Sequence, residues 1–311
     1  MKNIFFTLFL ILGIAISAKA QTPGSPESPA DTSYWKKGMT VGLNFTNTGF
    51  SGFWQGGGIP SLAITGLGNF FANYEKGKHQ WTNTLDLAYG TIRQGDSDAE
   101  FVKSEDRIDL TSKYGYRLSP VLLASTLLNF RTQFDIGFEF PEGPTGPRNY
   151  ISQTLAPGYI NWGIGLDYQP NEDFSVYFSP VNSKTTIVLD TTLSTLYMPA
   201  DFAGEEIRVE LGTFLNLKYR TDVMENVTFQ TKADFFTNYL ENFGNVDVNW
   251  ENLLAFQVNK YITTTFFTHL IYDDDIRFAI DENEDGVIER RAPRTQFKHV
   301  LSIGLTYTLK D

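Results

Sequence analysis

The sequence contains no cysteine and only three histidines. Without cysteine the chain forms no disulfide and has no thiol chemistry, so small disulfide-stabilised secreted folds are excluded. After Gln21 there is no run of about eighteen apolar residues, which excludes a membrane-spanning helix there. Basic residues are also few, with 25 Lys and Arg against 36 Asp and Glu. This balance argues against nucleic acid as a partner.

The first twenty residues have the pattern of a signal peptide. A charged start precedes an apolar core, Ile4 to Ser17, and Ala18-Lys19-Ala20 forms a cleavage site of the A-x-A type. The apolar core is too short to anchor a protein in a membrane, which takes about twenty residues. We therefore predict an exported chain in which 1–20 is removed, 21–34 is a flexible periplasmic leader and 35–311 forms a single domain.

The last apolar run, residues 297–309, alternates almost without error between two kinds of side chain. Side chains along a strand point to opposite faces in turn, so this run predicts a strand with one apolar and one mostly polar face. The apolar face carries Phe297, His299, Leu301, Ile303, Leu305, Tyr307 and Leu309.

The same alternation recurs through the chain and predicts an all-β fold, a transmembrane up-and-down antiparallel barrel of about 12 strands. Short and long links between the segments alternate, as an even-stranded barrel with both termini in the periplasm requires. The predicted strands lie near 40–47, 61–74, 80–92, 102–118, 121–135, 158–169, 173–188, 206–220, 226–238, 246–259, 261–273 and 297–309.

Alternation also predicts which face of each strand meets lipid. In 159–169, Trp162, Ile164 and Leu166 are expected outside, with Asn161 and Asp167 inside. A slip of one residue would place lumen charges in hydrocarbon, at about 2–4 kcal/mol for each Arg or Lys near the midplane, so the register is strongly specified.

Aromatic residues gather at the strand ends, as the interfacial girdles of a membrane barrel do. A soluble β-sandwich or lipocalin-like barrel is the alternative, but such folds rarely combine this many long strands with aromatic ends and a signal peptide. The girdle residues are Tyr74, Tyr116, Tyr168, Tyr219, Tyr261 and Tyr307 on the periplasmic side, and Tyr89 and Tyr272 on the outer side.

The segment from Ala233 to Ile276 contains the phrases FFTNYL, NVDVNWE, NKYI and LIYDDDI, and RTQFKHVLSIGLTYTL follows near the end. With these motifs the chain resembles a family of exported Bacteroidota proteins catalogued as a domain of unknown function, thirty-seventy-eight in that series. The resemblance extends over 35–311. It implies an outer-membrane β-barrel of unknown activity, and it supplies no catalytic residues.

Charged side chains are expected along the lumen wall. The strand 102–118 places Lys103, Glu105, Arg107, Asp109, Lys113 and Arg117 on one face. Such a wall can select ions in a channel, or its charges can pair and fill the interior. The predicted lumen set is Glu105, Arg107, Asp109, Arg131, Asp167, Arg208, Glu210, Lys218, Lys232, Asp234 and Glu251.

The loop 281–289 resembles the first half of a calcium-binding EF-hand loop, with Asp281, Asn283 and Asp285 as oxygen ligands and Gly286 at the turn. Ala292 stands where a bidentate Glu is expected. An acidic solvated loop is therefore the alternative to calcium, and no other cofactor is predicted.

We predict no enzymatic activity, because no nucleophile motif such as G-x-S-x-G occurs and Ser302 lies on the opposite face from His299. Two functions remain open. One is a small channel or transport conduit for small polar solutes with a charged lumen. The other is a non-conducting structural or binding barrel acting through its long loops at 136–157, 189–205 and 274–296. Either barrel implies outer-membrane lipid and the barrel-insertion machinery as partners. Oligomeric state stays open.

Overall fold

The computed structural model describes residues 34–50, 59–95, 99–138, 149–280, 282 and 288–310. The predicted signal peptide, the leader up to residue 33 and the calcium ligands Asp281, Asn283 and Asp285 lie outside these residues. Within the described chain, no helix is both long and apolar enough to cross a membrane.

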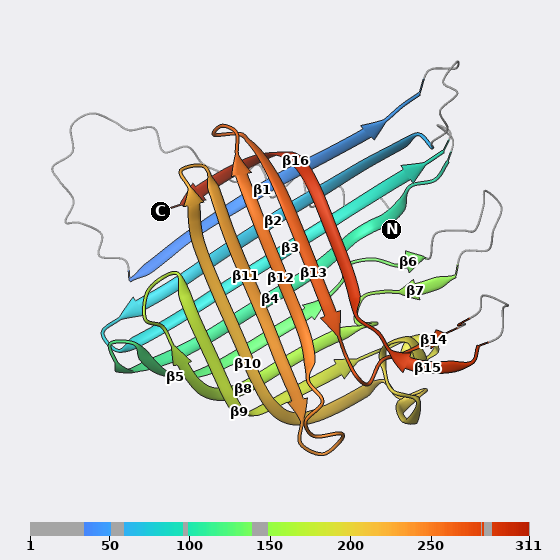
Figure 1. Cartoon of the computed structure of the whole chain (residues 1–311). Helices are drawn as coiled ribbons and strands as arrows, with labels where there is room; N and C mark the ends of the chain where they lie inside the picture. The colour runs from blue at the N-terminus through green and yellow to red at the C-terminus, as the bar shows by residue number, and fades with distance from the viewer. Residues whose placement is uncertain are drawn as a thin grey trace. The chain divides into compact units, whose positions relative to one another are not determined.

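Residues 34–311 form one compact unit, a closed antiparallel β-barrel of twelve strands (Figure 1). The predicted fold and strand number are therefore confirmed. The strands of the barrel are β1 (Trp35–Thr48), β2 (Ser61–Lys76), β3 (His79–Gln94), β4 (Val102–Ser119), β5 (Leu122–Thr132), β8 (Gly158–Tyr168), β9 (Phe174–Ile187), β10 (Ile207–Met224), β11 (Val227–Asn238), β12 (Asp247–Gln257), β13 (Ile262–Tyr272) and β16 (Gln296–Lys310).

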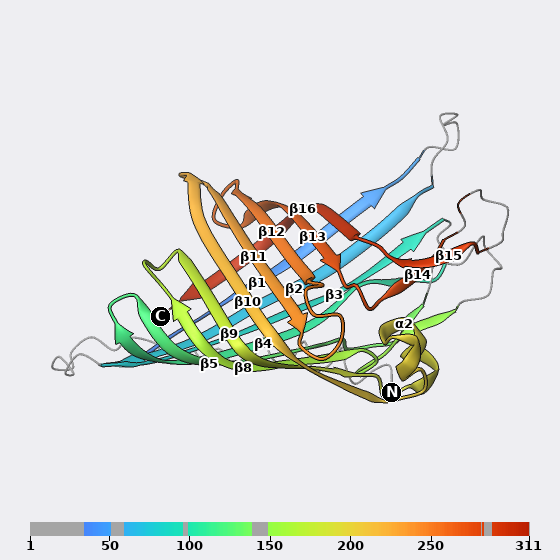
Figure 2. The ribbon, with the colours of Figure 1, turned by 60° about the horizontal axis from the view of Figure 1, so that its bottom comes forward.

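Each strand pairs with its neighbour in the chain, and β1 pairs with β16 to close the ring. Short turns connect the strands at one end of the barrel, and the long loops lie at the other (Figures 1 and 2). Around the ring the order is β1, β16, β13, β12, β11, β10, β9, β8, β5, β4, β3, β2.

The outward face is apolar. Trp162, Ile164 and Leu166 of β8 are exposed, whereas Asp167 between them and Tyr168 is fully buried. A continuous belt of exposed apolar side chains on a barrel is the surface that a lipid bilayer covers. At the short-turn end the ring of Trp35 lies 5.2 Å from that of Tyr74, which is one of the predicted girdle residues.

The long loops contain more structure than the sequence predicts. Two hairpins, β6 (Gly137–Phe138) with β7 (Tyr150–Ser152) and β14 (Arg277–Ile280) with β15 (Arg290–Pro293), extend beyond the barrel (Figure 1). Short helices η1 (Thr191–Leu193), α2 (Ser194–Tyr197) and η2 (Ala200–Phe202) lie between β9 and β10. These helices fold because Leu193 and Met198 pack on Ala156 and Val188, a small apolar core that alternation along the chain does not reveal.

One strand is shorter than predicted. The sequence predicts a strand over 121–135, but β5 ends at Thr132. The backbone N–H groups of Phe134 and Asp135 donate to the carboxylate of Asp106 at 2.7 Å and 2.9 Å, so they leave the sheet ladder.

Candidate functional site

The candidate site is the lumen. All eleven charged residues of the predicted lumen set occupy inward-facing positions, as the register and their partners across the barrel indicate. Their surroundings differ greatly from one side of the barrel to the other. We therefore describe the lumen as a divider and two lobes.

The divider consists of three ion pairs that reach across the lumen. Arg107 on β4 pairs with Glu251 on β12 at 3.7 Å, and these strands lie opposite each other in the ring. Asp109 on β4 pairs with Lys232 on β11 at 3.6 Å. Glu105 on β4 pairs with Lys298 on β16. The strand β4 is thus tied to the far wall at three successive inward positions.

On one side of the divider lies the packed lobe, which is made of the inward side chains of β5, β8, β9, β10 and β11. Its centre is an aromatic and aliphatic cluster of Leu127, Tyr177, Phe214 and Phe236, all buried. The Tyr177 hydroxyl donates to the Gly163 carbonyl oxygen at 2.8 Å. Glycine at 163 leaves the space that Ser179 and Asn182 occupy, since a Cβ there would lie 2.5 Å and 2.6 Å from their side-chain oxygens.

Arg131 of the packed lobe lies between two carboxylates. Arg131 donates to Asp109 at 3.0 Å and to Asp234 at 2.9 Å. Asn129 and Asn216 donate to these same two carboxylates, each at 2.5 Å. Opposite charges held together by extra hydrogen bonds are the arrangement in which buried ions are tolerated.

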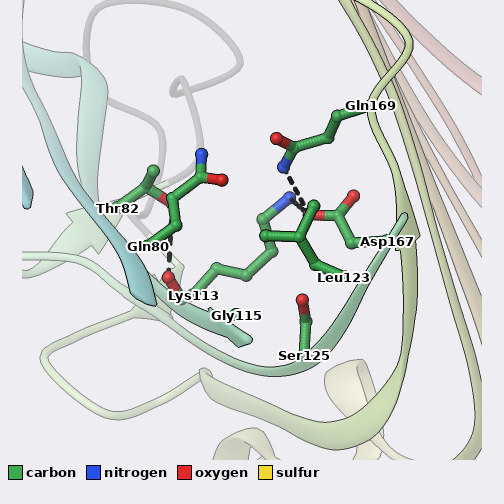
Figure 3. Close-up of a pocket in the computed structure, with 8 residues that line it drawn as sticks. All are labelled: Gln80, Thr82, Lys113, Gly115, Leu123, Ser125, Asp167 and Gln169. Atoms are coloured by element: carbon green, nitrogen blue, oxygen red, sulfur yellow. Dashed lines mark hydrogen bonds and ion pairs between the residues drawn. The ribbon is translucent and has the colours of Figure 1, made fainter. Parts of the chain in front are cut away.

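A small pocket at the short-turn side of the packed lobe is closed by another ion pair. Lys113 of β4 reaches Asp167 of β8, and Gln169 donates to the same carboxylate at 2.7 Å (Figure 3). Both charged side chains are almost fully buried, at 9% and 1% exposed. The rest of the wall comes from Leu123 and Ser125 of β5, Gly115 of β4, and Gln80 and Thr82 of β3 (Figure 3).

A third group lies at the long-loop end of the packed lobe. Arg208 is buried and contacts Glu210 at 3.2 Å and both Glu241 and Asp275 at 2.7 Å. Lys184 contacts Asp247 at 2.6 Å and Asp273 at 3.3 Å.

Alternation along the chain does not identify Lys184 as a residue of the lumen. The strand β9 has a bulge, because Ser179 pairs with Phe214 whereas Asn182 pairs with Gly212. The extra residue moves Lys184 from the outer face to the lumen. Pro180, inside an otherwise regular strand, is the signal that could have located this bulge.

A second bulge corrects the prediction for Lys103. Glu105 pairs with Gly90 but Lys103 pairs with the adjacent Thr91, so the two side chains lie on opposite faces rather than on one. Lys103 instead contacts Asp106 at 2.8 Å and the Asp135 carbonyl oxygen at 2.6 Å. It is therefore not one of the charges that line the lumen.

The open lobe lies on the other side of the divider and is made of the inward side chains of β13, β16, β1, β2 and β3. Its wall is lined largely by small hydroxyl and amide groups. Thr40 and Thr308 are 3.1 Å apart, Thr263 and Thr306 are 2.9 Å apart, and Asn44 donates to Ser302 at 3.1 Å.

Inward side chains in the open lobe keep much of their surface. Leu67 is 36% exposed and Val300 is 37% exposed, although both face the interior. In the packed lobe the inward Leu127 and Phe214 are 3% and 5% exposed. Inward side chains of the open lobe are therefore less covered than those of the packed lobe.

The histidines and Ser302, the side chains considered for catalysis from the sequence, do not come together in one site. His269 bonds Asn249 at 2.6 Å and lies near Glu251, while His299 faces outward and Ser302 inward. Lys218 lines a narrow void with Lys232 and Asp234. Among the described residues no cluster of acidic or histidine side chains is arranged to hold a metal ion. Calcium binding in the 281–289 loop stays a prediction.

Residues 45–138 match the model of a family described as "Protein of unknown function (DUF3078)". The matched segment runs from β1 to β6 and covers less than half of the chain. The motifs between Ala233 and Ile276 lie outside it. The match supports the resemblance to a family of unknown function, and an origin in Bacteroidota stays a prediction.

No curated protein matches the chain. Among solved structures, the chain is similar to an outer membrane channel from Pseudomonas putida F1, with TM-score 0.39, 11% identity and coverage of 92% of this chain and 100% of that one. It is similar to the NanC porin, with TM-score 0.33, 8% identity and coverage of 87% and 98%. It is also similar to the beta domain of the Bordetella autotransporter BrkA, with TM-score 0.33, 9% identity and coverage of 88% and 98%.

Proposed function

We propose that this protein is an outer-membrane conduit for small polar solutes, and that the solutes pass along the open lobe. The signal-peptide pattern and the apolar outer belt support the location. The observation that carries the function is the contrast between the two lobes, since the inward Leu67 and Val300 of the open lobe are exposed whereas the inward Leu127 and Phe214 of the packed lobe are buried.

The divider supplies the charges that a passing solute meets. Arg107 and Lys298 keep exposed surface on their side chains, 34% and 44%, although each is paired. A cation on the wall of a narrow passage favours anions and disfavours cations. Arg208 is 4% exposed and surrounded by carboxylates, so it does not meet solutes.

Single-channel conductance of the refolded mature chain in a planar bilayer tests the proposal. We expect discrete steps, and we expect Arg107→Glu to shift the reversal potential toward cation preference. Arg107→Gln and Arg208→Gln form a matched pair, since each removes one guanidinium. Only the former should change selectivity.

A non-conducting barrel is the second candidate, and the divider favours it because ion pairs cross the whole lumen at β4. In that case the work falls to the long loops and their partners. A demonstrably folded barrel that gives no current steps in salt gradients would favour this candidate and contradict the conduit.

A further inference from the structure

The seam between β1 and β16 is incomplete. These strands pair from Gly38–Lys310 to Asn44–Gly304, which is seven residue pairs and the shortest ladder in the barrel. Among the residues that the structure describes, β1 beyond Asn44 continues to Thr48 paired only with β2. Within the same residues, β16 on the far side of Gly304 extends to Gln296 paired only with β13. Both views show the two strands diverging there (Figures 1 and 2).

Side-chain exposure agrees with a break in the wall. Phe45 is 59% exposed, and Thr46, Asn47 and Thr48 are exposed on both faces of the strand. Across the seam Leu301 is 69% exposed. The inward-facing Thr46 and Thr48 are exposed, unlike the inward Gly42 and Asn44 in the paired part of β1, so this end of the strand has lost cover on its inner side.

The break lies at the depth of lipid, since Phe45, Leu301 and Ile303 are outward-facing and apolar. Unpaired backbone is not left facing hydrocarbon, but it is tolerated where it lines a passage. A lateral opening that leads into the open lobe satisfies this requirement.

An apolar row lies behind the opening. Leu253, Phe267 and Val300 are directly paired neighbours on β12, β13 and β16, and all face inward. The adjacent row on the long-loop side is Glu251, His269 and Lys298, and the row on the other side ends in Thr265 and Ser302. An apolar strip between an ionic row and a hydroxyl row matches a molecule with an apolar body and a polar end.

We infer that the seam between β1 and β16 is a lateral opening through which a single-chain amphiphile passes between the outer leaflet and the open lobe. Its apolar body lies along Val300 and Phe267. This inference shares the open lobe with the proposed conduit, but it concerns a different route and a different class of solute.

Cysteine labelling tests the opening, because the natural chain has no cysteine and each variant carries a single thiol. The variants Val300→Cys and Phe267→Cys report the apolar row. Leu301→Cys, which faces outward, is the positive control, and Phe214→Cys in the packed lobe is the negative control. Each refolded barrel in vesicles is treated with N-dodecylmaleimide, which stays in the lipid, or with a sulfonated maleimide, which stays in water.

We expect N-dodecylmaleimide to label Val300→Cys and Phe267→Cys at least about tenfold faster than Phe214→Cys, a difference of about 1.4 kcal/mol in barrier. Excess dodecanol should slow the labelling of Val300→Cys and Phe267→Cys by the water-soluble reagent. The rate at which that reagent labels Thr40→Cys should stay the same. Labelling of both variants by the water-soluble reagent alone, without an effect of dodecanol, would overturn the inference. Conductance of the same preparations tests the axial conduit separately.

Discussion

The two lobes of the lumen are built from the same alternating strands but end in opposite states. The packed lobe combines large side chains, Tyr177, Phe214 and Phe236, with ion pairs such as those of Arg131, which are supported by further hydrogen bonds. The open lobe places Thr, Ser, Asn and Gly at most inward positions of β16 and β1. Side-chain volume therefore decides which half of the barrel is filled.

The number of strands alone does not decide whether the interior of this barrel is filled or open. Eight strands enclose an interior that side chains fill, and sixteen leave an aqueous channel. A ring of twelve lies between these limits. Here the interior is divided by the ion pairs of β4 rather than filled or emptied uniformly.

The largest effect is expected from removing an aromatic anchor of the packed lobe. Phe214→Ala should lower the free energy of unfolding by about 3–5 kcal/mol, because a fully packed phenylalanine leaves a cavity. Phe267→Ala in the open lobe should cost less than about 2 kcal/mol, since that ring is only half-buried. Urea unfolding of both variants in lipid vesicles measures the difference, and equal losses would contradict the two-lobe description.

Ion pairs should show the same contrast. Asp167→Ala leaves Lys113 buried without its partner and should cost about 3–5 kcal/mol of folding free energy. Glu105→Ala removes a partner of Lys298, whose side chain is 44% exposed, and should cost at most about 1 kcal/mol. The single variants Lys113→Met and Lys298→Met and the double variants Asp167→Ala/Lys113→Met and Glu105→Ala/Lys298→Met complete a double-mutant cycle for each ion pair. A coupling at Glu105 as large as that at Asp167 would mean that the open lobe is closed to water.

Glycines offer a smaller test of packing. A Cβ at Gly163 would lie 2.5 Å from the Ser179 hydroxyl and 2.6 Å from Asn182 Oδ1, so Gly163→Ala should destabilise the barrel by about 1–3 kcal/mol. A Cβ at Gly42 would meet its nearest neighbours at 3.6 Å, which is ordinary contact. Thermal unfolding should therefore leave Gly42→Ala close to the natural protein, and a large loss there would show that the open lobe is tighter than described.

The smallest effect concerns the loop beside the packed lobe. Hydrogen bonds from Thr192 and Tyr150 lower the pKa of the Asp190 carboxylate. Because the pKa is lower in the folded loop, the stabilisation is present above the unfolded pKa of about 3.9 and is lost as pH falls through the folded value. Proteolysis of the 188–206 loop should therefore accelerate on acidification, and Asp190→Asn should remove that pH dependence. Unchanged pH dependence in Asp190→Asn would place the titrating group elsewhere.

Much of the fold followed from alternation, because one face of each strand meets lipid and the other does not. Residues in β8 and β10 such as Ile164 and Arg208 have the faces that the sequence predicts. Alternation failed at bulges, where one extra residue exchanges the two faces. Lys184 and Lys103 are two cases. Pro180 marks the bulge beside Lys184, but the polar or apolar character of the segment around Lys103 does not reveal the second bulge.

The sequence by itself determined the barrel, its strand number and the charged character of its interior, since these depend on local periodicity and link length. Only the tertiary structure decided which charges meet, because Arg107 and Glu251 or Lys298 and Glu105 come together through closure of the ring. The division into lobes and the incomplete seam at Asn44 and Gly304 also arise from that closure. They depend on the side-chain volumes of strands distant in sequence and on how far the first and last strands run side by side.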